Sequence, residues 1–351
     1  MVRMMSSNPE LYIRIPPEKA ETYHKSVITS FGKVGVISNS EINLEAFIPS
    51  RYITDNNDNN EVVGNIIAIQ DSKLFSDLGI SRFPESGGFI SKESVGFSNE
   101  MKNSLYQIYN RQIIVNHIPF RSVIEFSLDD NIETVICPDS PTLHYLIPSA
   151  LRNVANVCAN RCGYLGIHCA AVEKNGSVYL IVGRGRSGKS TLYVNLLEKG
   201  LNPMNDDLVF LFSEGDDIIV KSIPLFAKLR LSSIPYIETS NLFPPYEPSK
   251  TIEHEIYLDC EKRYDRANSL SGNVKAIIFP KINNKHNRIK SVDFNQKKKD
   301  LFREIITQQT MVLNDNLIKL YGSLKKTPLY EVELSTNISE ACDMIFNEIL
   351  L

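Results

Sequence analysis

The spacing of apolar positions changes along the chain, and the change falls near residue 140. Before it, apolar and polar residues alternate or form short apolar runs, which is typical of strands. These runs cover residues 11–15, 33–37, 61–69, 91–98, 112–118, 122–126 and 134–137. Because no long helical pattern separates them, the sequence predicts a β-rich region over residues 1–140 with an antiparallel sheet. Substrate or partner binding and plain structural support both remain open as its role.

After residue 140, helical and strand patterns alternate. Helical spacing predicts helices over residues 142–160, with a break or restart near Pro148, and over 191–199, 301–311, 316–324 and 338–350. Strand patterns occur at 163–172, 178–182, 208–212, 218–222, 275–279 and 329–334. The sequence therefore predicts an α/β protein, α+β overall, whose second domain covers residues 141–351.

Composition limits the classes of function. The 351 residues suffice for two domains, and the hydrophobic content of 42% supports a buried core. A net charge of −3 and a pI near 6.1 argue against a nucleic-acid partner. The six cysteines are scattered, the N-terminus lacks an apolar signal core, and no apolar run approaches a membrane span. We therefore expect a cytoplasmic protein without a membrane partner.

The strongest chemical signal lies between the strand pattern at 178–182 and the helical pattern at 191–199. Residues 183–190 read Gly-Arg-Gly-Arg-Ser-Gly-Lys-Ser, which fits G-x-x-x-x-G-K-[ST] without a mismatch. Glycines let successive backbone N–H groups turn toward an anion, and the helix that follows directs its positive end to the same place. The motif predicts ATP binding, with Lys189 on the β- and γ-phosphates and the Ser190 hydroxyl on Mg²⁺. The candidate nucleotide-binding residues are Gly183, Arg184, Gly185, Arg186, Ser187, Gly188, Lys189, Ser190 and Thr191.

Two adjacent carboxylates, Asp206 and Asp207, precede the apolar run at 208–212. An ordinary phosphate-loop ATPase carries its Mg²⁺-binding Asp elsewhere, in a long apolar strand, but the strand at 275–279 is followed by Pro280 and Lys281 and carries no acid. The pair allows a division of labour, in which Asp207 holds Mg²⁺ together with Ser190 and Asp206 accepts the proton of an attacking hydroxyl. A turn is the structural alternative, because Asp favours turns.

The chain over about residues 143–212 resembles HPr kinase/phosphorylase, and more closely the HPr-kinase-like proteins of peptide-modification gene clusters. The resemblance is carried by His168-Cys-Ala-Ala-Val, by the glycine-rich motif and by Lys199-Gly-Leu-Asn-Pro-Met-Asn-Asp-Asp207. It implies a phosphoenolpyruvate-carboxykinase-type P-loop core. It also implies that His168 lies beside the phosphates as a catalytic residue, although a lone His in an apolar strand is more often part of the core. Residues 222–232 lack the glycines of the true HPr kinase signature, so the resemblance does not extend to HPr as substrate.

These patterns together predict an ATP- and Mg²⁺-dependent kinase. The expected acceptor is a Ser or Thr hydroxyl on a peptide or small protein, and the resemblance implies a precursor peptide of a modified natural product. Arg184, Arg186 and Arg230 are further candidates to neutralise charge on the transferred group. Two alternatives stay open: a kinase of a free hydroxy amino acid or other small metabolite, and a non-catalytic nucleotide-binding regulator. The resemblance also implies a homo-oligomer.

Overall fold

The computed structural model describes residues 23–55, 62–73, 105–109, 112–117, 122–127, 131–137, 140–230, 242–243, 255–283, 285–306 and 315–350. The strands expected at 11–15 and 91–98 lie outside these residues. Contacts divide the chain into two compact units, one of residues 1–45, 50–158 and 246–252 and the other of residues 46–49, 159–245 and 253–351. The domains expected from the sequence, 1–140 and 141–351, stay a prediction. The contact grouping differs from them in assigning most of the helix after residue 140 to the first unit.

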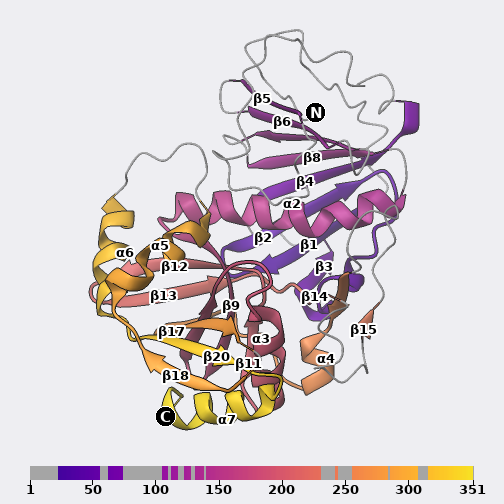
Figure 1. Cartoon of the computed structure of the whole chain (residues 1–351). Helices are drawn as coiled ribbons and strands as arrows, with labels where there is room; N and C mark the ends of the chain where they lie inside the picture. The colour runs from indigo at the N-terminus through magenta and orange to yellow at the C-terminus, as the bar shows by residue number, and fades with distance from the viewer. Residues whose placement is uncertain are drawn as a thin grey trace. The chain divides into compact units, whose positions relative to one another are not determined.

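The first unit is built on an eight-stranded mixed sheet (Figure 1). Its strands, in sheet order, are β3 (Ile53–Asp55), β1 (Tyr23–Thr29), β2 (Gly32–Ser38), β4 (Val62–Gln70), β8 (Ile132–Cys137), β7 (Ser122–Ser127), β6 (Gln112–His117) and β5 (Leu105–Tyr109). Strand β4 pairs in parallel with both β2 and β8. The prediction of an antiparallel sheet is therefore wrong at the centre. The connections into and out of β4 exceed the dozen or so residues that a parallel crossover requires.

Helix α2 (Ser140–Arg161) packs on this sheet through apolar residues at helical spacing. Its buried side chains include Leu143, Leu146, Ile147, Ala150, Leu151 and Val154. Gly64 of β4 permits the close approach, because a Cβ built there would lie 2.6 Å from Val154 Cγ1. The helix continues through Pro148, so the expected break does not occur. Within the described residues, α2 included, no helix is both long and apolar enough to cross a membrane.

A carboxyl group is buried between α2 and the sheet. Glu133 of β8 is 1% exposed, and its Oε1 accepts a hydrogen bond of 3.3 Å from Asn153 Nδ2 of α2. Its Oε2 is buried with no hydrogen-bond partner among the described residues. Burial raises the pKa of Glu133 to about 8, against a smaller opposing effect of the Asn153 amide. The folded protein therefore holds this group as a neutral acid near neutral pH.

The Glu133→Gln variant is expected to lack a pH dependence of the free energy of unfolding that the wild type has. The folded-state pKa lies above the ordinary value, so the stability from this group is full in mild acid and is lost as pH rises toward about 8. Within that window the wild type should lose up to about 1.4 kcal/mol per pH unit relative to the Gln variant. Urea unfolding of both proteins at mildly acidic and mildly alkaline pH measures the difference. Glu348→Gln is the control, because Glu348 is exposed. Equal unfolding free energies of the wild type and Glu133→Gln at every pH would contradict the expectation.

The second unit is built on a nine-stranded sheet with helices on both faces (Figure 1). The strands along its main path are β10 (Ser177–Val182), β9 (Leu165–Lys174), β12 (Leu208–Glu214), β13 (Asp217–Ser222), β17 (Ser271–Ile282), β20 (Leu329–Leu334) and β18 (Arg288–Ser291). Two short strands, β11 (Asn202–Asn205) and β19 (Ile305–Ile306), also pair with β9, and β10 also pairs in parallel with β17. A separate small sheet contains β14 (Ala227–Arg230), β16 (Glu255–Leu258) and β15 (Leu242–Phe243). The mixed architecture confirms the α/β class.

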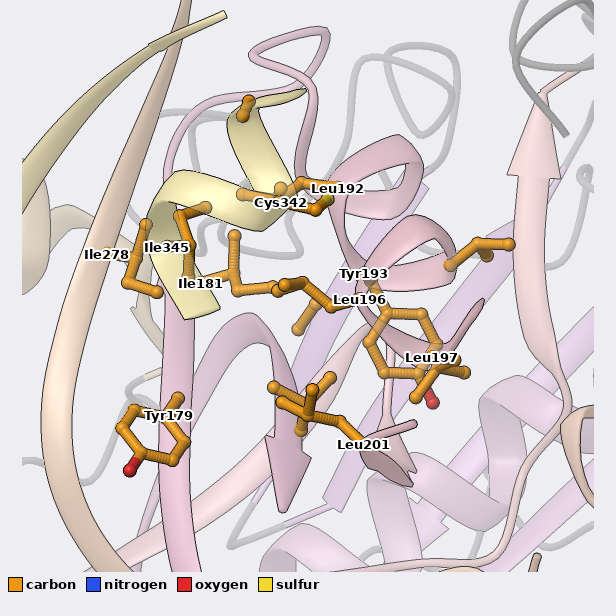
Figure 2. Close-up of a cluster of buried hydrophobic side chains, with 14 of the residues drawn as sticks. Tyr179, Ile181, Leu192, Tyr193, Leu196, Leu197, Leu201, Ile278, Cys342 and Ile345 are labelled. Carbon is orange, nitrogen blue, oxygen red and sulfur yellow. The ribbon is translucent and has the colours of Figure 1, made fainter. Parts of the chain in front are cut away.

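Each face of the larger sheet has its own core, because successive strand residues point to opposite sides. On one face, α3 (Lys189–Glu198) and α7 (Ile338–Glu348) pack on Tyr179 and Ile181 of β10 (Figure 2). On the other face, α5 (Phe294–Glu304) and α6 (Asp315–Lys326) pack on Leu180 and Val182 of the same strand. A short helix, α4 (Cys260–Tyr264), follows β16. Strand β10 is thus held from both sides, and the glycine-rich loop begins at its end.

Helix α5 ends earlier than the sequence predicts. The helical pattern extends over 301–311, but the helix stops at Glu304 and the next two residues form β19. Ile305 and Ile306 pair with Ile167 and Gly166 of β9. The prediction is wrong here because β-branched side chains fit a half-buried sheet edge well, and tertiary pairing overrides the local pattern. Residues 307–311 lie outside the described residues.

Candidate active site

The glycine-rich loop joins β10 directly to α3, as the sequence predicts for residues 178–199. Gly188 caps the helix with φ 99° and ψ 9°, a left-handed conformation, and Arg186 has φ 67°. The Ser187 N–H donates to the Arg184 carbonyl at 3.1 Å, which closes the turn. The helical ladder begins with the Leu192 N–H on the Gly188 carbonyl at 2.8 Å. The loop and the first turn of α3 therefore bring several backbone N–H groups to the N-terminal end of the helix.

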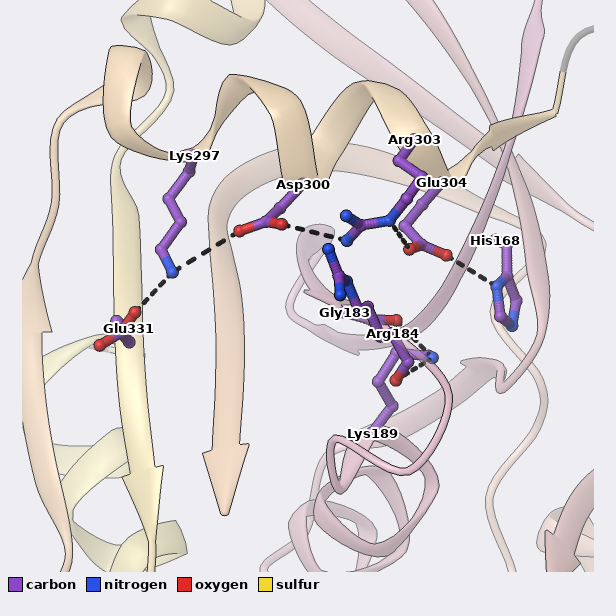
Figure 3. Close-up of polar contacts among 9 residues, drawn as sticks. All are labelled: His168, Gly183, Arg184, Lys189, Lys297, Asp300, Arg303, Glu304 and Glu331. Atoms are coloured by element: carbon purple, nitrogen blue, oxygen red, sulfur yellow. Dashed lines mark hydrogen bonds and ion pairs between the residues drawn. The ribbon is translucent and has the colours of Figure 1, made fainter. Parts of the chain in front are cut away.

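Lys189 is folded back into this loop. The residue is 7% exposed, and its Nζ donates to the Gly183 carbonyl at 2.6 Å and to the Arg184 carbonyl at 3.4 Å (Figure 3). A lysine is rarely buried without partners, because removing the ammonium from water is costly. Here the carbonyls of the loop itself hold the charge in place. By contrast, the side chains of Arg184 and Arg186 are exposed.

A bend built by Asn205 presents the two carboxylates. The Asn205 Oδ1 accepts from the backbone N–H groups of Asp207 at 2.8 Å and Leu208 at 2.9 Å. Its Nδ2 donates to the Ile223 carbonyl at 2.9 Å, which ties the bend to the chain after β13. Asn forms such side-chain turns readily. Asn205 is a positioning residue that sequence reasoning missed, although its place directly before the Asp pair was a usable signal.

Asp206 is the more buried of the two acids, at 6% exposed. Its Oδ2 accepts the backbone N–H of Lys228 at 2.7 Å, while its Oδ1 is buried without a hydrogen-bond partner among the described residues. Burial raises the pKa of Asp206 to about 6, and the charge of Asp207 adds to the shift. The Lys228 amide, the nearby Ser190 hydroxyl and the Lys189 ammonium act in the opposite direction. These effects show that Asp206 lies close to both Ser190 and Lys189.

His168 lies between two carboxylates. Its Nδ1 is 3.0 Å from Glu304 Oε2 (Figure 3). Its Nε2 is 3.5 Å from Asp207 Oδ1. The His168 and Asp207 side chains are partly exposed, whereas the Glu304 side chain is 9% exposed. Burial acts to raise the pKa of Glu304, but the His168 hydrogen bond, followed by the charges of His168 and Lys189 and a hydrogen bond from Arg303, lowers it overall. Glu304 is thus held as a buried carboxylate.

The geometry brings together most of the residues singled out in the sequence. Ser190 and Lys189 are near enough to Asp206 to lower its pKa, and His168 Nε2 lies 3.5 Å from Asp207 Oδ1. Their roles as catalytic, nucleotide-binding and metal-binding residues stay predictions. Glu304 was missed, and no local signal could have found it, because only the pairing of β19 with β9 brings it to His168.

The residues present fit a magnesium ion. Two buried polar atoms, Ser187 Oγ of the loop and Asp206 Oδ1 at the Asn205 bend, have no hydrogen-bond partner in the described part of the chain. Carboxylate and hydroxyl oxygens are the donors that Mg²⁺ prefers, and it often takes only one or two carboxylates when phosphates supply the other ligands. The described residues contain no group of three or more His, Cys, Asp or Glu side chains placed to hold a metal.

Comparison with solved structures finds a weak likeness. No protein-family model matches the chain, and no curated protein matches it. Among solved structures, the Hpr(Ser) kinase/phosphatase from Coxiella burnetii is similar over 53% of this chain and 96% of that chain, with 14% identity and a TM-score of 0.28. At that score the likeness carries no argument about the fold or function of this chain.

The loop conformation gives a direct test of Gly188. A Cβ at this position would require an unfavourable left-handed φ and would lie 3.0 Å from Leu334 Cδ1. We expect Gly188→Ala to lower the free energy of unfolding by about 1–2 kcal/mol. Gly185→Ala is the matched control, because a Cβ there has no neighbour within 4 Å and the backbone is not left-handed. Urea unfolding of both variants measures the difference. Equal losses of unfolding free energy would contradict the requirement for glycine at position 188.

Proposed function

We propose that the chain is an ATP- and Mg²⁺-dependent kinase that transfers the γ-phosphate to a Ser or Thr hydroxyl of a peptide or small protein. One observation carries the proposal: Lys189 of the glycine-rich loop and Asp206 are both buried, and the Lys189 charge acts on the Asp206 carboxyl group. A cation next to the helix N-terminus suits a polyphosphate, and an adjacent base suits a hydroxyl nucleophile. The resemblance of residues 143–212 to HPr-kinase-like proteins supports the same class.

In this proposal the loop amides and Lys189 bind the β- and γ-phosphates. Lys189 now donates to two neutral carbonyls of its own loop. Hydrogen bonds between charged groups are stronger than those to neutral carbonyls, so phosphate oxygens compete well for the ammonium. The side chain then neutralises charge on the transferred group. Arg184 and Arg186 are exposed on the same loop and extend the positive charge toward solvent.

Ser190 and Asp207 would hold the Mg²⁺, which would supply positive charge to offset that of the phosphate groups. Asp206 would take the proton from the acceptor hydroxyl. Its pKa, raised to about 6 by burial, is closer to neutrality than that of an ordinary carboxyl, as a general base requires. The partly exposed His168 lies on the Asp207 side of the site.

The acceptor class is the least determined part of the proposal. A peptide or small protein is favoured by the resemblance to proteins of peptide-modification clusters, and a precursor peptide of a modified natural product is the specific candidate. The first unit is the proposed place for partner or substrate recognition.

The first experiment is transfer of label from ATP, with Mg²⁺ present, to a pool of peptides and free hydroxy amino acids. Label on a Ser or Thr of a peptide is the expected outcome. Label on a free amino acid would replace the peptide acceptor by a small metabolite. Tight ATP binding without transfer to any acceptor would contradict the kinase and leave a nucleotide-binding regulator.

Asp206→Asn should abolish transfer without unfolding the protein. Loss of a general base typically costs about 10²–10⁴ in rate. The amide removes a charge that burial disfavours, so the melting temperature should not fall. Asp216→Asn is the matched control, because Asp216 is exposed and pairs with Lys326 at 2.5 Å, on the surface of the described part of the chain. Transfer at wild-type rate by Asp206→Asn would exclude Asp206 as the base.

Ser190→Ala and Ser190→Thr separate the hydroxyl from the rest of the side chain. The motif accepts either hydroxyl residue, so Thr should keep metal binding. Loss of the hydroxyl should raise the Mg²⁺ concentration for half-maximal transfer by about tenfold or more. Titration of Mg²⁺ against transfer rate gives the comparison. Equal Mg²⁺ dependence in the Ala variant and the wild type would remove Ser190 from the proposed metal site.

A further inference from the structure

A large apolar side chain is exposed to water beside the glycine-rich loop. Among the described residues, the exposed large apolar side chains are Ile282 at 49%, Ile318 at 62% and Tyr321 at 41%. A single exposed apolar residue needs no explanation by itself, so its position matters more than its exposure. Ile318 and Tyr321 lie on α6. Ile282 instead reaches the loop, because a Cβ built on Gly188 would lie 3.6 Å from Ile282 Cγ1 and 3.8 Å from Ile282 Cδ1.

Strand β17 brings Ile282 to the edge of the sheet at which the loop begins. Ile282 is the last residue of β17, and β17 runs parallel to β10, from which the loop starts. Leu334 ends β20, which is parallel to β17, and its Cδ1 lies 3.0 Å from the same Cβ position on Gly188. The ends of three parallel strands thus meet at the loop. Ligands of α/β sheets bind outside the carboxyl ends of such strands.

The chain that follows Ile282 is fixed by hydrogen bonds. The Asn283 N–H donates to the Leu334 carbonyl at 3.0 Å, and Asn283 Nδ2 donates to Glu333 Oε2 at 2.7 Å. Asn283 Oδ1 accepts from the Lys285 N–H at 2.9 Å, as Asn side chains do in turns. The backbone at the end of β17 is therefore tied to β20, and it holds the exposed Ile282 side chain against the loop.

The acidic groups of the site lie on the other side of the loop. Strand β10 has β9 as one neighbour and β17 as the other. His168 belongs to β9, and Asp206 and Asp207 follow β11, which pairs with β9. Ile282 belongs to β17. A triphosphate that is bound along the loop with its γ-phosphate beside the carboxylates therefore directs its nucleoside away from β9 and toward β17.

We infer that the side chain of Ile282 packs against the purine base of the bound nucleotide. This assignment deepens the proposed function and rests on it, because it requires ATP to bind at the loop. An aliphatic side chain gives a flat ring dispersion contacts and removes apolar surface from water. A polyphosphate without a base cannot make this contact. Ile282 therefore contributes to the affinity for the base, whereas the loop amides and Lys189 contribute to the affinity for the phosphates.

Two ligands that share the phosphates separate these contributions. ATP and inorganic tripolyphosphate, each with Mg²⁺, are titrated into the full wild-type chain and into Ile282→Ala by calorimetry. We expect the Kd for ATP to rise by roughly five- to twentyfold because apolar contact is lost, and the Kd for tripolyphosphate to change less than about twofold. Ile318→Ala is the matched control, because it makes the same truncation at an exposed residue of α6, and it should change neither Kd.

A fluorescent reporter gives a second measurement at the same position. The chain contains no Trp, so Ile282→Trp carries a single indole beside the loop. Aromatic side chains stack on nucleotide bases. ATP should therefore quench the emission of Ile282→Trp, whereas tripolyphosphate should leave it unchanged. Ile318→Trp is the control and should respond to neither ligand.

The possible outcomes separate this inference from the proposed function. An unchanged Kd for ATP in Ile282→Ala, or Ile282→Trp emission that does not respond to ATP, would overturn the inference alone. Equal losses of affinity for ATP and tripolyphosphate would also overturn it, because Ile282 would then act through the loop. A higher KM for the acceptor at unchanged ATP affinity would assign Ile282 to the acceptor instead. A wild type that binds no ATP would overturn the proposed function and this inference together.

Discussion

The second unit depends on holding charged groups out of water at the start of α3. Lys189 and Asp206 are both almost fully buried, and neither would be stable there without specific partners. The loop carbonyls hold the ammonium, and the Lys228 amide holds the carboxylate. Each partner comes from a different turn of the backbone.

The packing of the apolar core offsets the free-energy cost of burying these two charged groups. Strand β10 is packed on both faces, so the loop that follows it starts from a rigid point. Gly188 in a left-handed conformation then turns the chain into α3 with Leu334 close against it. A rigid scaffold under a conformationally demanding loop is the usual condition for precise placement of chemical groups. Ser187 Oγ and Asp206 Oδ1 are buried and have no hydrogen-bond partner among the residues that the structure describes, so a bound ligand would supply the missing interactions.

The first unit also buries a carboxyl group, for which no catalytic role is proposed. Glu133 is buried against α2 with one oxygen satisfied by Asn153, and burial keeps it neutral. In the second unit, by contrast, Glu304 is buried but has His168 and Arg303 as partners, and its pKa is lowered. Two buried glutamates in one chain thus differ in charge because their partners differ. Burial alone does not decide the ionisation of a carboxyl group.

The sequence by itself determined the local elements of the site. The apolar run of β10, the glycine-rich motif and the helical spacing of α3 are contiguous, so local pattern was enough to predict strand, loop and helix in order. The pairing of distant segments was decided only by the tertiary structure. The parallel pairs of β4, the early end of α5 and the contact of Glu304 with His168 all depend on long-range sheet pairing. A single sequence carries no local signal for such pairings, because their energy comes from partners more than a hundred residues away in the case of Glu304 and His168.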